Sequence, residues 1–231
     1  MPDEIEDSAQ LPKSLMRFFL EREVANFYSY LSTLEDALNT KRREVSMNIN
    51  FADSKCVNSD PGDQNRKELL NLKVEAEQLE GFSNLLRQSY LVSLYSFMEL
   101  WLIRECHIDS KHRDGGKSYK SIKEKGIEKA KKYFADVMRN DFPFGTSQDW
   151  LWITNFRLLR DCIVHRHGSL TGFSDFEADP ILNAFVQNES GLSLFGVDNN
   201  QVLVEYEFCL KALKTVHRFM LDIFSLSTDA G

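Results

Sequence analysis

The chain has 231 residues, of which 42% are hydrophobic and 27% are charged, and its formal net charge is −7. This length is enough for one or two domains with a sizeable core, and the acidic balance excludes a protein that holds nucleic acid over a broad basic face. With only 11 Gly and 5 Pro, the chain has few turn residues, which favours a small number of long helices over a many-stranded sheet.

The cysteines and the apolar stretches are typical of a cytoplasmic protein. The four cysteines form no CxxC pair, so neither a zinc site nor a small disulfide scaffold is expected. The stretch MPDEIEDSAQ is acidic and lacks the apolar core of a signal peptide. The longest apolar stretch, Leu91 to Ile103, is too short for a membrane span and carries Glu99 in its middle.

The first part of the chain is predicted to form two helices separated by a loop. Apolar residues recur at intervals of three to five from Leu15 to Leu38, so we expect an N-terminal helix over residues 11–40. Asn, Asp, Ser, Pro and Gly dominate residues 46–65, which predicts a flexible loop. A long helix over residues 66–106 should follow, and its second half is apolar almost all round, as in a helix buried at the centre of a bundle.

The second part is predicted to add three helices and a hairpin. The motif helix, residues 148–167, starts after Ser147, which is a suitable N-cap, and ends by Gly168. The other segments are a loop over 109–118, a basic helix over 119–139, irregular chain over 172–190, a β-hairpin within 192–208 and a last helix over 207–226. The expected fold is therefore all-α: one domain over residues 1–231, a bundle of four to five helices with its core in 66–226 and a small late β-hairpin.

The motif helix ends in a cluster of ionisable side chains, within the stretch RLLRDCIVHRHGSL. Arg160, Asp161, His165 and His167 fall within eight residues. Asp161 and His165 are four residues apart and share one face of a helix, so the carboxylate can accept a hydrogen bond from the imidazole and fix its tautomer. Arg160 lies roughly 140° from His165 around the helix, but its long side chain lets both groups reach a common groove at the helix end.

These residue types suit the cleavage of a phosphodiester. A histidine can take a proton from a ribose 2′-hydroxyl or give one to the leaving 5′-oxygen. An arginine can hold the phosphate oxygens through two parallel hydrogen bonds, and such a site needs no metal and no other cofactor. Histidine and arginine near a helix C-terminus also complement the helix dipole, so the residues alone leave a purely structural role open.

The stretch LLRDCIVHRHG resembles the signature of the HEPN superfamily, an arginine followed by a polar residue, any three residues and a histidine. Arg160, Asp161 and His165 occupy the three defined positions. The stretch SYLVSLYSFMELWLIREC also resembles the central helix of such domains, and an apolar helix follows the motif. Some toxins of the family carry a tyrosine two residues after the histidine, which their antitoxin modifies. His167 stands there instead, so the resemblance does not extend to that regulation, and His167 is either a second proton carrier or an exposed bystander.

The resemblance implies a function and partners. Active members are metal-independent endoribonucleases, often toxins or antiviral defence effectors, and they form homodimers that bring two motifs into one cleft. By this resemblance His165 is the general acid/base, Arg160 the phosphate clamp and Asp161 the orienting group. RNA is then the substrate, and an antitoxin or a sensor protein the regulator. Inactive members are dimerisation or binding modules, which is the alternative function.

Glu99 is a supporting candidate, because it lies mid-helix in an apolar stretch and a buried carboxylate needs a partner. Members of the family that the motif resembles often place a polar residue on this helix near the motif, so the resemblance implies that Glu99 pairs with Arg160. A structural pairing with another cation, or a position that points out of the bundle, is the alternative.

A basic strip precedes the motif helix. Between Lys111 and Lys132, nine Lys or Arg stand against three Asp or Glu, so this strip is a candidate for tracking an RNA backbone. A solvated helix face is the alternative. The RNA-binding candidates are Lys120, Lys123, Arg157 and Arg166, with Tyr119 and Tyr133 expected to stack on bases.

Overall fold

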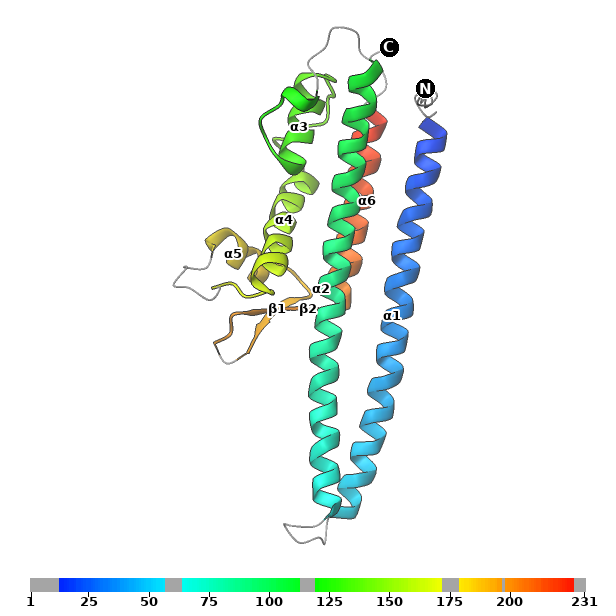
Figure 1. Ribbon diagram of the computed structural model, residues 1–231, viewed down its shortest axis with the longest axis vertical. Coiled ribbons are helices and arrows are strands. Elements are labelled where there is room, and N and C mark those ends of the chain that lie inside the picture. The colour runs from blue at the N-terminus through cyan, green and yellow to red at the C-terminus, as the bar shows by residue number, and fades with distance from the viewer. Residues whose placement is uncertain (1–12, 57–63, 113–118, 172–178, 197, 227–231) are drawn as a thin grey trace, which may run out of the picture. The chain divides into compact units, whose positions relative to one another are not determined.

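The computed structural model describes residues 13–56, 64–112, 119–171, 179–196 and 198–226. Its elements, labelled in Figure 1, are α1 (Lys13–Cys56), α2 (Gln64–His112), a 3₁₀ turn η1 (Tyr119–Ser121), α3 (Gly126–Asp136), α4 (Gln148–Arg166), α5 (Pro180–Asn188), β1 (Leu192–Phe195), β2 (Gln201–Val204) and α6 (Tyr206–Leu226). The described residues are thus predominantly helical with one small late hairpin, which confirms the predicted all-α class. The described helices number six rather than four to five.

The contacts divide the chain into two compact units. The first unit contains the described parts of Met1–Phe27, Ser93–Arg160 and Lys211–Gly231, and the second contains those of Tyr28–Val92 and Asp161–Leu210. Each unit is therefore assembled from stretches that are far apart in the sequence, and α4 crosses the boundary between Arg160 and Asp161. That the whole chain is one HEPN-like domain stays a prediction.

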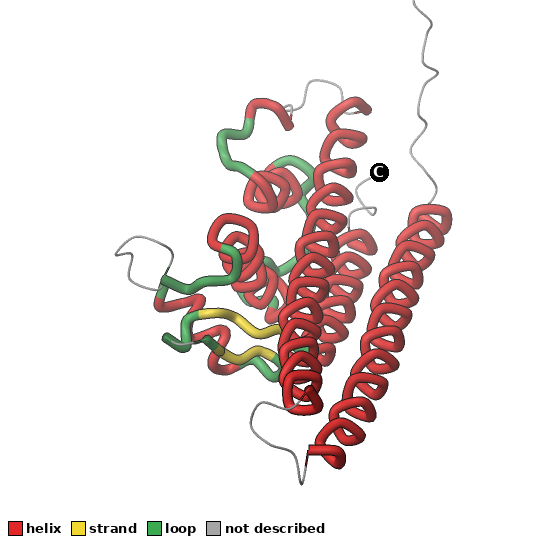
Figure 2. The backbone as a smooth tube through the Cα atoms, turned by 60° about the horizontal axis from the view of Figure 1, so that its bottom comes forward, coloured by secondary structure: helices red, strands yellow, loops and turns green. Residues whose placement is uncertain are grey.

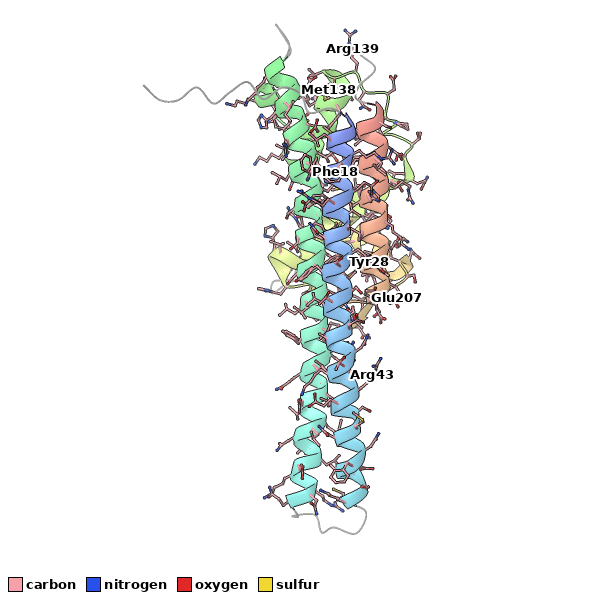
Figure 3. All side chains as sticks on the ribbon, turned by 90° about the vertical axis from the view of Figure 1, so that its right-hand side faces the viewer. Phe18, Tyr28, Arg43, Met138, Arg139 and Glu207 are labelled. Carbon is pink, nitrogen blue, oxygen red and sulfur yellow. The ribbon has the colours of Figure 1, made fainter. Side chains whose placement is uncertain are left out.

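In the second unit, α1 and α2 form an antiparallel coiled coil (Figures 1 and 2). Buried and half-buried side chains recur at alternating intervals of four and three along both helices, the 3.5-residue period that keeps one seam of each helix against the other. The seam residues are Leu31, Glu35, Leu38, Arg42, Val45, Ile49 and Ala52 on α1, and Leu69, Leu72, Ala76, Leu79, Ser83, Leu86 and Tyr90 on α2. Residues off the seam, such as Tyr28 and Arg43, lie on the exposed side of α1 that Figure 3 shows.

The predicted loop over residues 46–65 is wrong for residues 46–56, which complete α1, and for residues 64 and 65, which begin α2. Residues 57–63 lie outside the described residues. The coiled-coil seam explains the error, because only two residues in seven must be buried. Within 46–56 those two are Ile49 and Ala52. The Asn, Asp and Ser residues around them are typical of a loop when the sequence is considered without the partner helix.

Polar side chains of α2 hold the hairpin in the second unit. The Asn84 side-chain amide donates to the Val202 carbonyl at 3.1 Å and accepts from the Val204 N–H at 2.8 Å, and Gln88 donates to the same Val202 carbonyl at 3.0 Å. Both side chains are buried. They form hydrogen bonds to backbone groups of β2 that face away from β1, groups that would otherwise need a further strand as their partner.

The short helix α5 lies in a stretch that was expected to be irregular. Asp179 caps it by accepting hydrogen bonds from the N–H groups of Ile181 and Leu182, and Pro180 occupies the first turn, where a missing N–H costs nothing. Leu182 is buried. The prediction missed this helix because it is only nine residues long.

In the first unit, an aromatic cluster fixes the start of α4. Phe142, Phe144, Trp150 and Phe219 meet with ring centroids 4.8 to 5.8 Å apart, spacings at which aromatic pairs attract one another beyond simple burial. Phe219 comes from α6, so α6 anchors the beginning of the motif helix.

Two predictions about this unit need correction. The predicted helix over residues 119–139 is shorter, because only α3 is α-helical there and its first residue, Gly126, has a left-handed φ of +56°. The second half of α2 is not buried all round. Ser93, Ser96 and Leu100 are exposed, although Leu94 and Met98 are fully buried.

Candidate functional site

The motif lies at the C-terminal end of α4, and local sequence fixes both ends of this helix. At the start, the Ser147 hydroxyl accepts from the Trp150 N–H at 3.2 Å, as an N-cap does. At the end, His167 and Gly168 have φ of +53° and +78°, and the Gly168 N–H donates to the Cys162 carbonyl at 3.2 Å. Residues in this left-handed conformation commonly end helices. The predicted motif helix is therefore confirmed, with its last residue one position earlier.

The chain after α4 is tied to the hairpin within the second unit. The Val202 N–H donates to the Gly168 carbonyl at 2.9 Å, and the Leu170 N–H donates to the Asn200 carbonyl at 2.8 Å. The guanidinium of Arg166 donates to the Leu170 carbonyl at 2.8 Å. These bonds hold the last turn of α4, which carries His165, on the hairpin.

Asp161 and His165 belong to the second unit and lie one turn apart on α4. Asp161 is half-buried and His165 is exposed. His167 is also exposed, and its left-handed backbone makes it part of the helix termination. The exposed imidazole of His165 is open to a substrate, with a carboxylate one turn before it on the same helix.

Arg160 belongs to the first unit and is held there from two sides. Its guanidinium lies 3.5 Å from the Glu99 carboxylate, which confirms the predicted pairing. It also lies over the ring of Tyr95, 4.8 Å from the centroid, in cation–π geometry. The Arg160 and Glu99 side chains keep 22% and 23% of their surface exposed, so this pair is reachable from solvent while its orientation is set by a buried ring.

The sequence prediction missed two residues of this cluster, Tyr95 and Gly126. Tyr95 precedes Glu99 by one turn of α2, and this spacing alone places both on one face. Gly126 passes so close to the carboxylate that a Cβ at this position would lie 2.8 Å from Glu99 Oε1. The carboxylate therefore sits beside the first residue of α3, where the helix dipole favours negative charge.

Only some of the cationic side chains of the basic strip are available to bind the phosphate backbone of RNA. Lys120 and Lys123 are exposed, as an RNA-binding role needs. Lys132 pairs with Glu124 at 2.6 Å, and Lys129 lies over the Tyr119 ring at 4.7 Å. Arg113 and Lys117 lie outside the described residues. Arg157 and Arg166 are half-buried, so they present less of their charge to solvent than the lysines do.

The expectation that Tyr119 and Tyr133 stack on bases is wrong. Both rings are buried and pack edge-to-face on each other, with centroids 5.6 Å apart. The Tyr133 hydroxyl donates to Asp109 at 2.9 Å, and burial together with this carboxylate raises its pKa to about 12. Burial likewise raises the pKa of Tyr119 to about 12. The two rings are core residues of the first unit.

The cysteines and metal-binding side chains add no second centre among the described residues. All four cysteines are free, and burial raises the pKa of Cys162, the one within the motif, which makes it a poor nucleophile. No group of three His, Cys, Asp or Glu side chains in the described parts of the chain is placed to hold a metal ion. None of the described helices combines the length and the apolar composition that a membrane span requires.

Comparison with protein-family models, with curated proteins and with solved structures gives no match for this chain. The geometry of the motif and its surroundings is therefore the basis for assigning a function.

Proposed function

We propose that this protein is a metal-independent endoribonuclease of HEPN type, acting in the cytoplasm as a homodimer and serving as a toxin or antiviral defence effector. His165 is the general acid/base, Arg160 the phosphate clamp and Asp161 the group that orients His165. An antitoxin or a sensor protein is the proposed regulator, and His167 is the candidate for a second proton carrier.

The proposed reaction is attack of a ribose 2′-oxygen on the adjacent phosphorus. His165 accepts the proton of the 2′-hydroxyl as the new P–O bond forms. The bond to the 5′-oxygen breaks, and this oxygen takes up a proton from a histidine. The products are a 2′,3′-cyclic phosphate and a 5′-hydroxyl, so the protein's residues move protons and Arg160 offsets the charge that builds on the phosphate oxygens.

The placement of Arg160 is the observation that carries this proposal. Its guanidinium is oriented by Tyr95 and Glu99 yet remains partly exposed, on the same helix as an exposed histidine. A clamp of this kind needs an arginine whose position is fixed before the substrate arrives, because an oriented cation costs no reorganisation during the reaction. The exposed Lys120 and Lys123 are proposed to add contacts to the RNA backbone.

The alternative function is a catalytically silent module that dimerises and binds a protein or nucleotide partner. One observation favours it: Glu99 already neutralises Arg160 at 3.5 Å. A phosphate must compete with this carboxylate for the guanidinium, whereas a structural arginine would keep its partner permanently.

Cleavage of a labelled RNA mixture in excess EDTA separates the two functions. The parent protein is compared with His165→Ala, and with His107→Ala as a control, because His107 is also an exposed histidine but lies outside the motif. Circular dichroism confirms equal folding. We expect cleavage by the parent and loss of cleavage in His165→Ala, with cyclic-phosphate ends on the products. Absence of cleavage by the folded, dimeric parent on all RNAs tested would favour the silent module.

A further inference from the structure

The ion pair between Glu99 and Arg160 differs in geometry from three other arginine–carboxylate pairs that join two helices. Its described contact places one guanidinium nitrogen, Nη2, 3.5 Å from one carboxylate oxygen, Oε2. This is long for a hydrogen bond, whose N···O distance is usually about 2.9 Å. In the other three pairs, two guanidinium nitrogens donate to both oxygens of the carboxylate: Arg87 with Glu35, Arg42 with Glu80 and Arg218 with Asp149. The carboxylate of Glu99 therefore binds its arginine less firmly than the carboxylates of these pairs do.

Solvent reaches both members of the pair, while a buried ring holds the arginine. The side chains of Arg160 and Glu99 are 22% and 23% exposed, against 11% and 8% for Arg87 and Glu35. Tyr95 is fully buried, and the Arg160 guanidinium lies 4.8 Å from the centroid of its ring. An anion from solution can therefore reach the guanidinium without unfolding the protein, and the cation–π contact keeps the guanidinium in place when the carboxylate moves away.

The carboxylate of Glu99 has a second place at which its charge is stabilised. Its other oxygen, Oε1, approaches Gly126 so closely that a Cβ there would lie 2.8 Å away. Gly126 is the first residue of α3, and the first N–H groups of a helix have no partner within that helix and carry partial positive charge. The exposed Lys125 directly precedes it. If Glu99 releases Arg160, its charge therefore stays beside positive groups, and the cost of a charge without a partner is avoided.

We infer that Glu99 is an exchangeable counter-ion that keeps small anions off Arg160 until an RNA strand takes its place. In the free protein the carboxylate occupies the guanidinium. When RNA binds, a phosphate of the strand takes that position, and Glu99 remains at the start of α3. Arginine suits this exchange, because its guanidinium binds carboxylates and phosphates in the same two-pronged geometry.

The neighbouring lysines explain why a strand succeeds where a single phosphate fails. Inorganic phosphate or a mononucleotide must compete with Glu99 through its contacts to Arg160 alone. A strand also brings its other phosphates to the exposed Lys120, Lys123 and Lys125 of the same unit, and each such contact adds affinity by releasing counterions. Competition with Glu99 weakens both kinds of ligand, but only the strand has further contacts that offset the loss.

This inference rests on the proposed function for the identity of the ligand. It concerns binding and no chemical step, so it is tested without cleavage. The probe is a fluorescein-labelled 2′-O-methyl oligonucleotide, in which no free 2′-hydroxyl is left to attack the phosphorus.

Fluorescence anisotropy measures the dissociation constant of this probe for the full-length protein. Glu99→Gln removes the charge and keeps the size of the side chain, so we expect the dissociation constant to fall about two- to fivefold, the range that corresponds to a partly exposed ion pair. Asp222→Asn is the control: it removes the same charge from an exposed acid of the same unit whose charge acts on Arg218, and it should bind the probe like the parent. Adenosine 3′-monophosphate, added as a competitor of the probe, should show an inhibition constant that falls by the same factor in Glu99→Gln.

A double-mutant cycle shows whether the effect passes through Arg160. In the Arg160→Gln background, Glu99→Gln should leave the dissociation constant unchanged, because no guanidinium remains for which the carboxylate competes. Circular dichroism confirms that each variant is folded. Glu99→Ala provides a second variant with the same expected direction, since it also removes the carboxylate.

The outcomes separate this inference from the proposed function. Folded Glu99→Gln and Glu99→Ala variants that bind the probe no more tightly than the parent overturn the inference, as does an equal gain in the Arg160→Gln background. An unchanged inhibition constant of adenosine 3′-monophosphate overturns the exclusion of small anions. RNA cleavage by the parent without tighter binding by Glu99→Gln counts against this inference alone. Tighter binding through Arg160 without cleavage of any RNA supports the inference and counts against the ribonuclease.

Discussion

The buried ion pair between Glu35 and Arg87 is predicted to be a major contributor to the stability of the coiled coil. Glu35 occupies a seam position of α1, and the Arg87 guanidinium donates to its two oxygens at 2.6 and 2.8 Å. Both side chains are almost fully buried, and Arg87 also donates to the Val204 carbonyl of β2 at 3.2 Å. The hydrogen bonds to Glu35 raise the pKa of Arg87, so the guanidinium keeps its charge throughout the accessible pH range.

Glu35→Ala therefore leaves a buried cation without its counter-charge. Removing one partner of such a pair costs about 3–5 kcal/mol of unfolding free energy, whereas replacing both partners by apolar residues is often neutral. We expect Glu35→Ala to fall in this range. The free energy of unfolding of Glu35→Leu/Arg87→Met should lie within about 1–2 kcal/mol of the parent value. The remaining difference arises because the Val204 carbonyl loses its hydrogen bond from Arg87.

Urea denaturation followed by circular dichroism measures these free energies, and a double-mutant cycle gives the coupling between the two residues. The matched control is the pair of Arg42 and Glu80, which joins the same two helices at 2.7 and 2.9 Å but leaves Glu80 mostly exposed. Glu80→Ala should cost less than about 1 kcal/mol. If Glu35→Ala costs no more than Glu80→Ala, burial does not decide the strength of these pairs and the reasoning is refuted.

Three further predictions concern glycines and a buried carboxyl. Gly126→Ala forces a left-handed φ on a residue with a Cβ, which costs about 1–2 kcal/mol, and places that Cβ 2.8 Å from Glu99 Oε1. The thermal unfolding temperature should therefore fall, and the rate of RNA cleavage should fall because Glu99 is displaced. Gly168→Ala, at φ +78° and with its Cβ 2.8 Å from the Gln88 amide, should lower the urea midpoint by a similar free energy. Burial raises the pKa of Glu105 from 4.5 to about 7, so between these two pH values the folded state binds a proton that the unfolded state has lost. The free energy of unfolding therefore falls by up to about 3 kcal/mol as the pH rises from 4.5 through 7. Glu105→Gln should be more stable than the parent above pH 7 and equal to it below pH 4.5.

Gly145→Ala is the control for both glycine variants. A Cβ added at Gly145 would meet no described atom within 4 Å beyond its chain neighbours, and this residue has no left-handed φ. The variant should change stability by less than about 0.5 kcal/mol. Equal stability of Gly126→Ala, Gly168→Ala and Gly145→Ala would contradict the close approaches described. For Glu105, a difference between variant and parent that does not change with pH would show that the carboxyl titrates at its ordinary pKa.

Local sequence was enough to predict the motif helix, and the family resemblance added the pairing of Glu99 with Arg160. Ser147 and Gly168 mark the ends of α4 because capping depends on neighbouring residues only. A carboxylate within an apolar stretch needs a partner, and the resemblance to the HEPN motif indicated that the partner of Glu99 is Arg160. Tyr95 could have been added from its spacing to Glu99.

Tertiary structure decided the features for which burial depends on a distant partner. Residues 46–56 are helical because α2 covers Ile49 and Ala52, and the sequence around these two residues is otherwise that of a loop. Tyr119 and Tyr133 are core residues because they pack on each other and on the end of α2. A side chain's type and spacing determine which helix face it joins, but only the packing of remote segments determines whether that face meets water, another helix or a second molecule.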